Sequence, residues 1–163
     1  MRKYLILIAA LVVAIDRLTK AMVIAKIPLY REVDVIPGLF RLVHLENTGA
    51  AFSLFADIPG PWPGRLLLLV SLIAVGVIVF FLWKLGEQLN VLTFCLALFL
   101  GGTLGNLWDR ILYGRVTDFL DFYVGQHHWP PFNVADSAIV VAAILLAAHV
   151  LLMPAAHSQE NQR

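Results

Sequence analysis

Hydrophobic and polar positions divide the chain into four long apolar stretches, joined by one long loop, one short link and one polar segment. The apolar stretches cover residues 4–25, 66–84, 91–112 and 134–153. A helix needs about 20 apolar residues to cross a bilayer, so the pattern predicts a transmembrane helix for each stretch. The second and third are joined by the short link LGEQLN, and we therefore expect them to form an antiparallel pair.

The two longer segments between these stretches have different patterns. Residues 26–65 alternate β-branched and aromatic residues with polar ones between proline and glycine breaks, which is typical of a few short strands. Residues 113–132 contain the aromatic motif VTDFLDFYVG and end after HHWPP, a pattern that favours an interfacial segment lying on the bilayer. The predicted fold is a single domain over residues 1–163. It is an all-α polytopic membrane protein with four transmembrane helices, a small extracytoplasmic β platform and an interfacial aromatic segment.

Composition supports a membrane protein and excludes several other classes. The 163 residues are 60% hydrophobic and 14% charged, with a mean hydropathy of +0.82, whereas about a quarter of the residues in a soluble domain are charged. The net charge of +1 gives no basic surface for nucleic acid. Cys95 is the single cysteine, which excludes an intrachain disulfide and a cysteine zinc cluster, and we expect no metal and no cofactor.

The first apolar stretch begins like a secretory signal peptide. Arg2 and Lys3 precede the run YLILIAALVVAI, as in the charged start of such peptides. The run does not end in a small-residue cleavage site, because Asp16, Arg17 and Lys20 follow it directly. We therefore expect an uncleaved first transmembrane helix.

The orientation follows from the number of spans and from the charges at their ends. An even number of spans places both termini on one side of the membrane. Arg2 and Lys3 favour a cytoplasmic N-terminus under the positive-inside rule, and Lys84 fits the same orientation. The loop 26–65 and the segment 113–132 then face outward.

Polar residues inside the apolar stretches need an explanation, since a charge in a membrane span costs about 2.5–3.5 kcal/mol on insertion scales. Asp16 and Lys20 lie four residues apart on one helical face and can form an ion pair. Asn106, Asp109 and Arg110 share a face of the third stretch. The simplest role for all five residues is to hold helices together.

Other residues of the same stretches also suit helix packing. Arg17 lies on a different face from Asp16 and Lys20, where it can meet a carboxylate of a neighbouring helix. The third stretch contains glycines that let another backbone or a bound molecule approach closely, namely Gly101, Gly102 and Gly105.

The polar groups of separate segments converge at the outer membrane face in this topology. The third helix runs outward and brings Asn106 and Arg110 toward that face, with Asp118 just beyond its end. The fourth helix runs inward from the same face, with Asn133 and Asp136 in its first turn. The outer loop adds the polar motif ENTGAAF. Helix packing alone does not require this convergence.

Each acid also has a simple structural interpretation. Asn133 is a favourable helix N-cap, and Asp136, three residues later, can complete a capping box and interact favourably with the helix dipole. Asp118 can be an ordinary loop acid, and Asp109 and Asp121 can be surface or structural acids. The residue pattern leaves these alternatives open.

Asp118 and Asp136 together favour a second interpretation, a catalytic pair. Two carboxyl groups held close together in a poorly solvated site share one proton. One can then activate water while the other polarises a carbonyl group, as in aspartic proteases. Other hydrolase motifs are missing: there is no HExxH, His127 and His128 are adjacent, and Ser137 lies in no GxSxG elbow.

Four blocks of the sequence resemble the bacterial lipoprotein signal peptidases, or type II signal peptidases. They are DRLTK (16–20), ENTGAAF (46–52), GGTLGNLWDRILYGRVTDF (101–119) and FNVADS (132–137). The resemblance extends from about residue 10 to 153, and the last two blocks are specific in combination. Arg17 departs from the glutamine expected in the first block. The resemblance implies a four-helix aspartyl peptidase of the bacterial inner membrane.

The resemblance also implies a substrate and roles for individual residues. The substrates are prolipoproteins whose cysteine already carries a diacylglyceryl group, and cleavage occurs just before that cysteine. Globomycin-type peptides are implied as inhibitors, and membrane lipid as a partner. Asp118 and Asp136 match the catalytic pair, whereas Glu46 and Asp109 receive no role. Supporting or substrate-binding positions match Asn106, Arg110, Asn133, Asn47, Gly49, Asp16, Lys20 and Gly102.

Two other functions fit the residue pattern less well. A small transporter or proton-relay protein could use Asp16, Arg110 and Asp136 as a relay, but the acids gather at one face instead of crossing the bilayer. A purely structural subunit needs no paired acids. For a peptidase, the glycines of the third stretch are expected to line a groove for the signal helix of the substrate.

Overall fold

The computed structural model describes residues 1–49 and 62–152. A long helix comes first and last in the chain, and between them two strands, two helices and two further strands follow one another. In chain order the elements are α1 (Arg2–Lys26), β1 (Glu32–Ile36), β2 (Phe40–Asn47), α2 (Trp62–Leu85), α3 (Val91–Tyr113), β3 (Val116–Val124), β4 (His127–His128) and α4 (Val134–Leu152).

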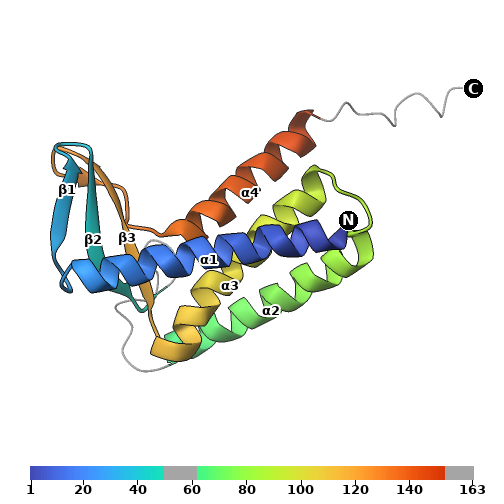
Figure 1. The fold of residues 1–163 in the computed structure, drawn as a ribbon, viewed down its shortest axis with the longest axis horizontal. Coiled ribbons are helices and arrows are strands. Elements are labelled where there is room, and N and C mark those ends of the chain that lie inside the picture. Colours follow the sequence, from blue (N-terminus) through green and yellow to red (C-terminus); the bar gives the residue numbers. More distant parts are fainter. Residues whose placement is uncertain (50–61, 153–163) are drawn as a thin grey trace, which may run out of the picture.

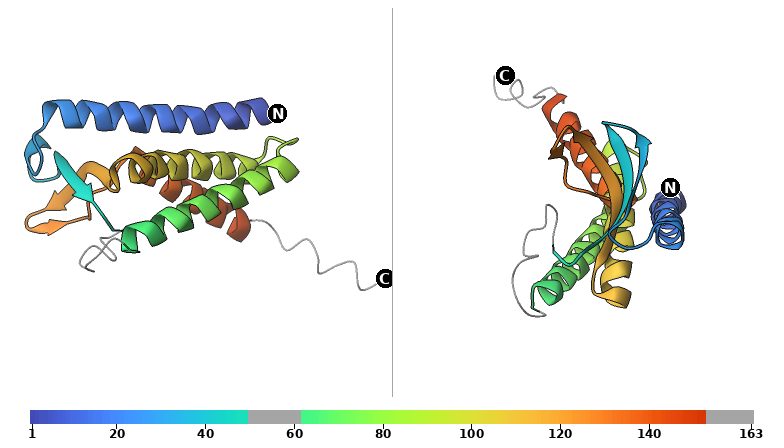
Figure 2. Two further views of the ribbon diagram at one scale, coloured as in Figure 1. Left: turned by 90° about the horizontal axis from the view of Figure 1, so that it is seen from below. Right: turned by 90° about the vertical axis from the view of Figure 1, so that its left-hand side faces the viewer.

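Helix α3 is the centre of the helical bundle, and the other three helices pack against it. Figure 2 shows α1 on one side of α3, with α2 and α4 on the other. The sheet lies at one end of the bundle, next to the end of α1 and the start of α4 (Figure 1). The N-terminus and the last turns of α4 lie at the opposite end (Figure 1). Helices α1 and α3 therefore end at the sheet end of the bundle, and α4 begins there.

Glycines in α3 allow its close approach to α1 and α4. A Cβ atom at Gly101 would lie 2.8 Å from the carbonyl oxygen of Ala9 in α1, and one at Gly102 would lie 2.5 Å from that of Ala135 in α4. Neighbouring helices thus occupy the space beside these glycines. The expectation of a substrate groove along them is wrong, because the small residues serve helix packing.

Among the described residues, three helices are long and apolar enough to cross a membrane, namely α2, α3 and α4. Their bounds lie close to the predicted stretches, although α2 begins at Trp62, four residues before the predicted start. Helix α1 has 25 residues, but Asp16, Arg17 and Lys20 interrupt its apolar sequence. Its crossing of the membrane therefore stays a prediction. Residue 153 of the predicted fourth span lies outside the described residues.

The small sheet is antiparallel, with the strand order β1–β2–β3–β4. Strands β1 and β2 confirm that short strands form in the loop after α1, of which residues 50–61 lie outside the described part. The segment 113–132 is not a separate interfacial segment, because Val116–Val124 forms β3 and pairs with β2. Most of the first residues of β3 are buried, so the strand lacks the alternation by which a half-exposed strand is recognised.

A row of polar side chains crosses the four strands of the sheet. Arg41 in β2 lies 2.8 Å from Glu32 in β1 and 2.6 Å from Asp121 in β3. Asp121 also lies 3.0 Å from Nδ1 of His128 in β4. Asp121 is only 1% exposed, and its two partners give it a structural role. This role is one of the two alternatives that the sequence left open for Asp121.

Candidate active site

The first turn of α4 places Asn133 and Asp136 against each other. The N–H of Asp136 donates to Asn133 Oδ1 over 3.0 Å, and the N–H of Asn133 donates to Asp136 Oδ2 over 3.2 Å. This reciprocal pair is the capping box suggested by the sequence, with aspartate in the position usually held by glutamate. Asp136 is therefore a cap, and the cap fixes its carboxylate at the sheet end of the bundle.

Strand β3 brings Asp118 to the same place. Asp118 Oδ1 accepts a hydrogen bond from Asn133 Nδ2 over 2.8 Å, and Asp118 Oδ2 accepts one from Asn47 Nδ2 over 2.9 Å. The N–H of Gly49 donates to Asn47 Oδ1 over 2.8 Å, which fixes the direction of the Asn47 amide. Two predicted supporting residues, Asn47 and Gly49, thus act on one acid.

Two asparagines connect the acids. Asn133 is fully buried and binds Asp118 through its side-chain amide and Asp136 through its backbone N–H. Asn106 of α3 donates from Nδ2 to Asp136 Oδ1 over 2.7 Å and accepts from Asn133 Nδ2 over 3.2 Å. Residues from α3, β3 and α4 therefore form one connected network around the two carboxyl groups.

Asp118 lies in a poorly solvated position, with only 4% of its surface exposed. Burial, followed by the negative charge of Asp136, raises the pKa of Asp118 to about 6, against the lowering effect of the hydrogen bonds from Asn47 and Asn133. Removal of water disfavours the charged form of a carboxyl group. Asp118 can therefore hold a proton at a pH where an exposed aspartate is fully ionised.

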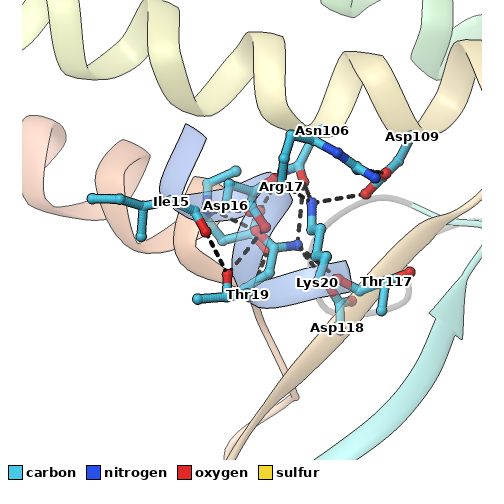
Figure 3. A network of polar contacts seen from close by, with 12 residues as sticks. Ile15, Asp16, Arg17, Thr19, Lys20, Asn106, Asp109, Thr117 and Asp118 are labelled. Atoms are coloured by element: carbon cyan, nitrogen blue, oxygen red, sulfur yellow. Dashed lines mark hydrogen bonds and ion pairs between the residues drawn. The ribbon is translucent and has the colours of Figure 1, made fainter. Parts of the chain in front are cut away.

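A second set of charges lies in α1 and α3, beside the acids (Figure 3). Lys20 Nζ lies 2.8 Å from Asp16 Oδ2 and 2.8 Å from Asp109 Oδ2, so the predicted Asp16–Lys20 pair is present. Arg17 also forms an ion pair with Asp109, the neighbouring-helix carboxylate that the sequence suggested. Asp16 Oδ1 accepts a hydrogen bond from the N–H of Ala135 over 3.0 Å. No sequence signal indicated this last contact, which ties α1 to the first turn of α4.

Arg110 of α3 lies near the acids without binding them directly. Its side chain is half-buried, and its positive charge interacts with Asp136 and Asp118. Within residues 1–49 and 62–152, its guanidinium group makes no hydrogen bond or ion pair. The planar group therefore has donors available for another acceptor.

The remaining predicted residues lie outside this network or only support it. Gly102 packs against Ala135 in the first turn of α4, so it serves the position of that helix. Glu46 forms an ion pair with Arg115 over 2.9 Å. The hydroxyl group of Ser137 donates to the carbonyl oxygen of Asn133 over 2.8 Å, so it completes the helix start.

This arrangement can carry out general acid–base chemistry. The pKa of the buried Asp118 is raised toward neutrality. The second acid, Asp136, accepts two hydrogen bonds and lies close enough to influence Asp118 electrostatically. Such a pair can take a proton from water and give a proton to a carbonyl oxygen.

Comparison of the sequence with known proteins identifies one protein family and relatives over most of the chain. The family described as signal peptidase (SPase) II matches residues 8–152. A lipoprotein signal peptidase of Desulforapulum autotrophicum is 40% identical over 147 residues, covering 90% of this chain and 91% of the relative. One of Geobacter sulfurreducens is 44% identical over 137 residues, covering 84% of each chain.

Solved structures agree with these relatives. A bacterial membrane enzyme determined by the in meso method at 2.3 Å resolution has a TM-score of 0.82 and 28% identity, covering 99% of this chain and 94% of that one. A second, at 1.9 Å, has a TM-score of 0.79, also at 28% identity, and covers 93% of this chain and 95% of that one. The chain belongs to the signal peptidase II family.

Proposed function

We propose that this protein is an aspartic endopeptidase that removes the signal peptide from diacylglyceryl-modified prolipoproteins, cutting just before the lipidated cysteine. Family membership supports a protease that cleaves signal peptides from prolipoproteins. The aspartic mechanism, with Asp118 and Asp136 as the catalytic pair, is our inference from the site.

The observation that carries the mechanism is the position of Asn133. Its side-chain amide lies 2.8 Å from Asp118, and its backbone N–H lies 3.2 Å from Asp136. One fully buried residue thus holds both acids at fixed positions. Ordinary caps and loop acids do not need a shared donor, whereas a catalytic pair needs constant separation.

We assign the shared proton of the resting enzyme to Asp118 and the negative charge to Asp136. Asp136 lies in the first turn of α4, where the helix dipole favours an anion, and both of its oxygens accept hydrogen bonds. Asp118 is the more deeply buried of the two. Asp136 is therefore the base and Asp118 the acid.

Cleavage then proceeds by attack of water on the peptide carbonyl carbon. Asp136 takes one proton from the water, and Asp118 gives its proton to the carbonyl oxygen, which produces a tetrahedral diol. As the C–N bond breaks, Asp136 gives its proton to the leaving nitrogen and Asp118 recovers one from a hydroxyl group. The products are a carboxyl group on the signal peptide and a free amine on the lipidated cysteine.

The donors of Arg110, which make no hydrogen bond within the described part of the chain, suit a carbonyl group of the bound peptide. Its guanidinium group is half-buried beside the acids, so a hydrogen bond to substrate would be poorly screened by water. Asn47 donates to Asp118 Oδ2, and the N–H of Gly49 holds the Asn47 amide in place. We propose that Arg110 binds the peptide and that Asn47 orients Asp118.

We propose that all four helices cross the bacterial inner membrane, with cytoplasmic termini and the site at the outer face. The charges of α1 are compatible with a span because Asp16 and Lys20 are fully buried and paired inside the bundle. The N-terminus and the end of α4 lie at the same end of the bundle, away from the sheet (Figure 1). The site then opens near the lipid that anchors the substrate. We propose that residues 1–163 form a single domain.

The pH dependence of cleavage tests the assignment of the proton. Because Asp118 must be protonated and its pKa is raised to about 6, kcat/KM is expected to fall as pH rises above about 6, toward tenfold per pH unit. Protonation of Asp136 should lower kcat/KM again at lower pH. Steady-state cleavage of a lipidated prolipoprotein in detergent, from pH 4 to 9, measures this profile.

A rate that rises through pH 7 and stays high would contradict the proton assignment, because it indicates a base that loses its proton near neutrality.

A globomycin-type peptide is expected to compete with the substrate in the same assay. The match to a signal peptidase family does not support the transporter and scaffold alternatives. Both alternatives predict that the purified wild-type protein does not cleave a prolipoprotein.

A further inference from the structure

We propose that Lys20 is a positioning residue that fixes the side-chain amide of Asn106 and, through it, the carboxylate of Asp136. The inference deepens the proposed function and rests on it, since it concerns how the base is held for attack on the substrate. It assigns a role in the reaction to a residue of α1 that touches neither acid of the pair.

The contacts of Lys20 supply the first step. Its side chain is fully buried, and Nζ lies 3.1 Å from Asn106 Oδ1, in addition to its two ion pairs with Asp16 and Asp109. Figure 3 shows Lys20 reaching from α1 toward Asn106 and Asp109 on α3. An ammonium group has three donors and no acceptor. Three oxygens thus surround Nζ, and the one that accepts a hydrogen bond from it belongs to Asn106.

The second step follows from the two ends of the Asn106 amide. Because Lys20 can only donate, the amide must present its oxygen to Nζ, and its Nδ2 group then faces Asp136 Oδ1 over 2.7 Å. Asn133 Nδ2 donates to the same Asn106 oxygen over 3.2 Å. Turning the amide by half a rotation would place NH2 against two donors and the oxygen against a carboxylate. Lys20 thus selects the orientation that supports the base.

The position of α4 gives independent support. Asp16, the i–4 partner of Lys20, accepts the N–H of Ala135 in the turn that carries Asp136. One turn of α1 therefore holds both the amide that binds the base and the helix start from which the base projects. A lysine that only held helices together would need a carboxylate partner, not a third contact with an amide beside the acids.

Arg17 provides a matched control in the same helix. It shares the Asp109 carboxylate with Lys20 but forms no hydrogen bond or ion pair with Asn106. Its guanidinium carbon lies 5.9 Å from the centre of the Trp108 ring, and 22% of its side chain is exposed. Loss of Arg17 therefore removes a charge and an ion pair between α1 and α3 while it leaves the amide of Asn106 in place.

The test compares kcat, KM and melting temperature for Lys20→Met, Arg17→Met, Asn106→Ala and the double variant Lys20→Met/Asn106→Ala. Lys20→Met is expected to lower kcat by about 10²-fold with little change in KM, because a small displacement of a reacting group has an effect of this size. Arg17→Met should lower the melting temperature and leave kcat within about twofold of wild type. In the Asn106→Ala background, Lys20→Met should lower kcat no further, because its effect passes through that amide.

Several results would overturn the inference. Wild-type kcat in Lys20→Met, an equal loss of kcat in Arg17→Met, or a full additional loss in the Asn106→Ala background would each show that Lys20 acts as a general structural ion pair. If Lys20→Met does not fold, the comparison of Lys20→Met/Asp16→Asn with Asp16→Asn tests the same contact without an unpaired buried charge, because Asp109 keeps its ion pair with Arg17. Normal cleavage by Asp118→Asn and Asp136→Asn would instead overturn the proposed function itself.

Discussion

Replacing Asp136 with asparagine is expected to lower kcat by about 10³–10⁴-fold, near the upper range for a single general base. The amide cannot take a proton from water, although it has nearly the same shape as the carboxylate. Its oxygen can still accept the hydrogen bond from Asn106 or from the N–H of Asn133, so α4 should keep its start. The measurement is kcat at saturating substrate, with helical content and melting temperature followed in parallel.

The pH dependence of cleavage by Asp136→Asn distinguishes the loss of the base from a shift in the pH at which the two acids work together. Because Asp136→Asn removes the base, no pH between 4 and 9 should restore cleavage. Activity that returns at high pH would indicate that another group can act as the base, and the role of Asp136 would then be wrong.

Replacing Asn133 with serine is expected to lower kcat by about 10²–10³-fold with little loss of stability. Serine is a good N-cap and can accept the N–H of Asp136. It has no amide group, so the hydrogen bonds from Asn133 Nδ2 to Asp118 and to Asn106 are lost together. A rate loss of this size has been seen when one donor to a developing charge is removed.

Ser137→Ala is the matched control for this variant. It removes the hydrogen bond to the carbonyl oxygen of Asn133, in the same helical turn, without touching the side-chain amide. Its kcat should stay within about twofold of wild type, since a neutral hydrogen bond contributes about 1 kcal/mol to stability. Equal losses of kcat in both variants would mean that only the helix start matters, and not the contact with Asp118.

Much of the site could be predicted because its residues lie at the ends of strongly apolar helices. Hydropathy locates α2, α3 and α4, so polar residues near their ends, such as Asn106 and Asp136, are recognisable as exceptions. The capping interpretation and the catalytic interpretation of Asp136 turned out to be compatible. The cap is the means by which the carboxylate is held in position.

Contacts between distant segments could not be predicted from the local pattern. Strand β3 lacks alternation because its first residues are mostly buried, so its pairing with β2 was missed. The glycines of α3 could equally have faced a substrate or a helix, and only the packed positions of Ala9 and Ala135 decide for helices. The third contact of Lys20 depends on the rotation of α1 relative to α3, which no spacing along the sequence determines.

Single-turnover cleavage of a diacylglyceryl-modified prolipoprotein by the purified protein is the most direct test of the paired acids. Wild type, Asp118→Asn, Asp136→Asn and Asp121→Asn would be compared with and without EDTA. Asp121 lies on the same strand as Asp118 but binds Arg41 and His128, so it controls for the loss of a buried acid. We expect cleavage by wild type and Asp121→Asn that resists EDTA, and no cleavage by the other two folded variants. Wild-type cleavage by either Asp118→Asn or Asp136→Asn would contradict the aspartic mechanism.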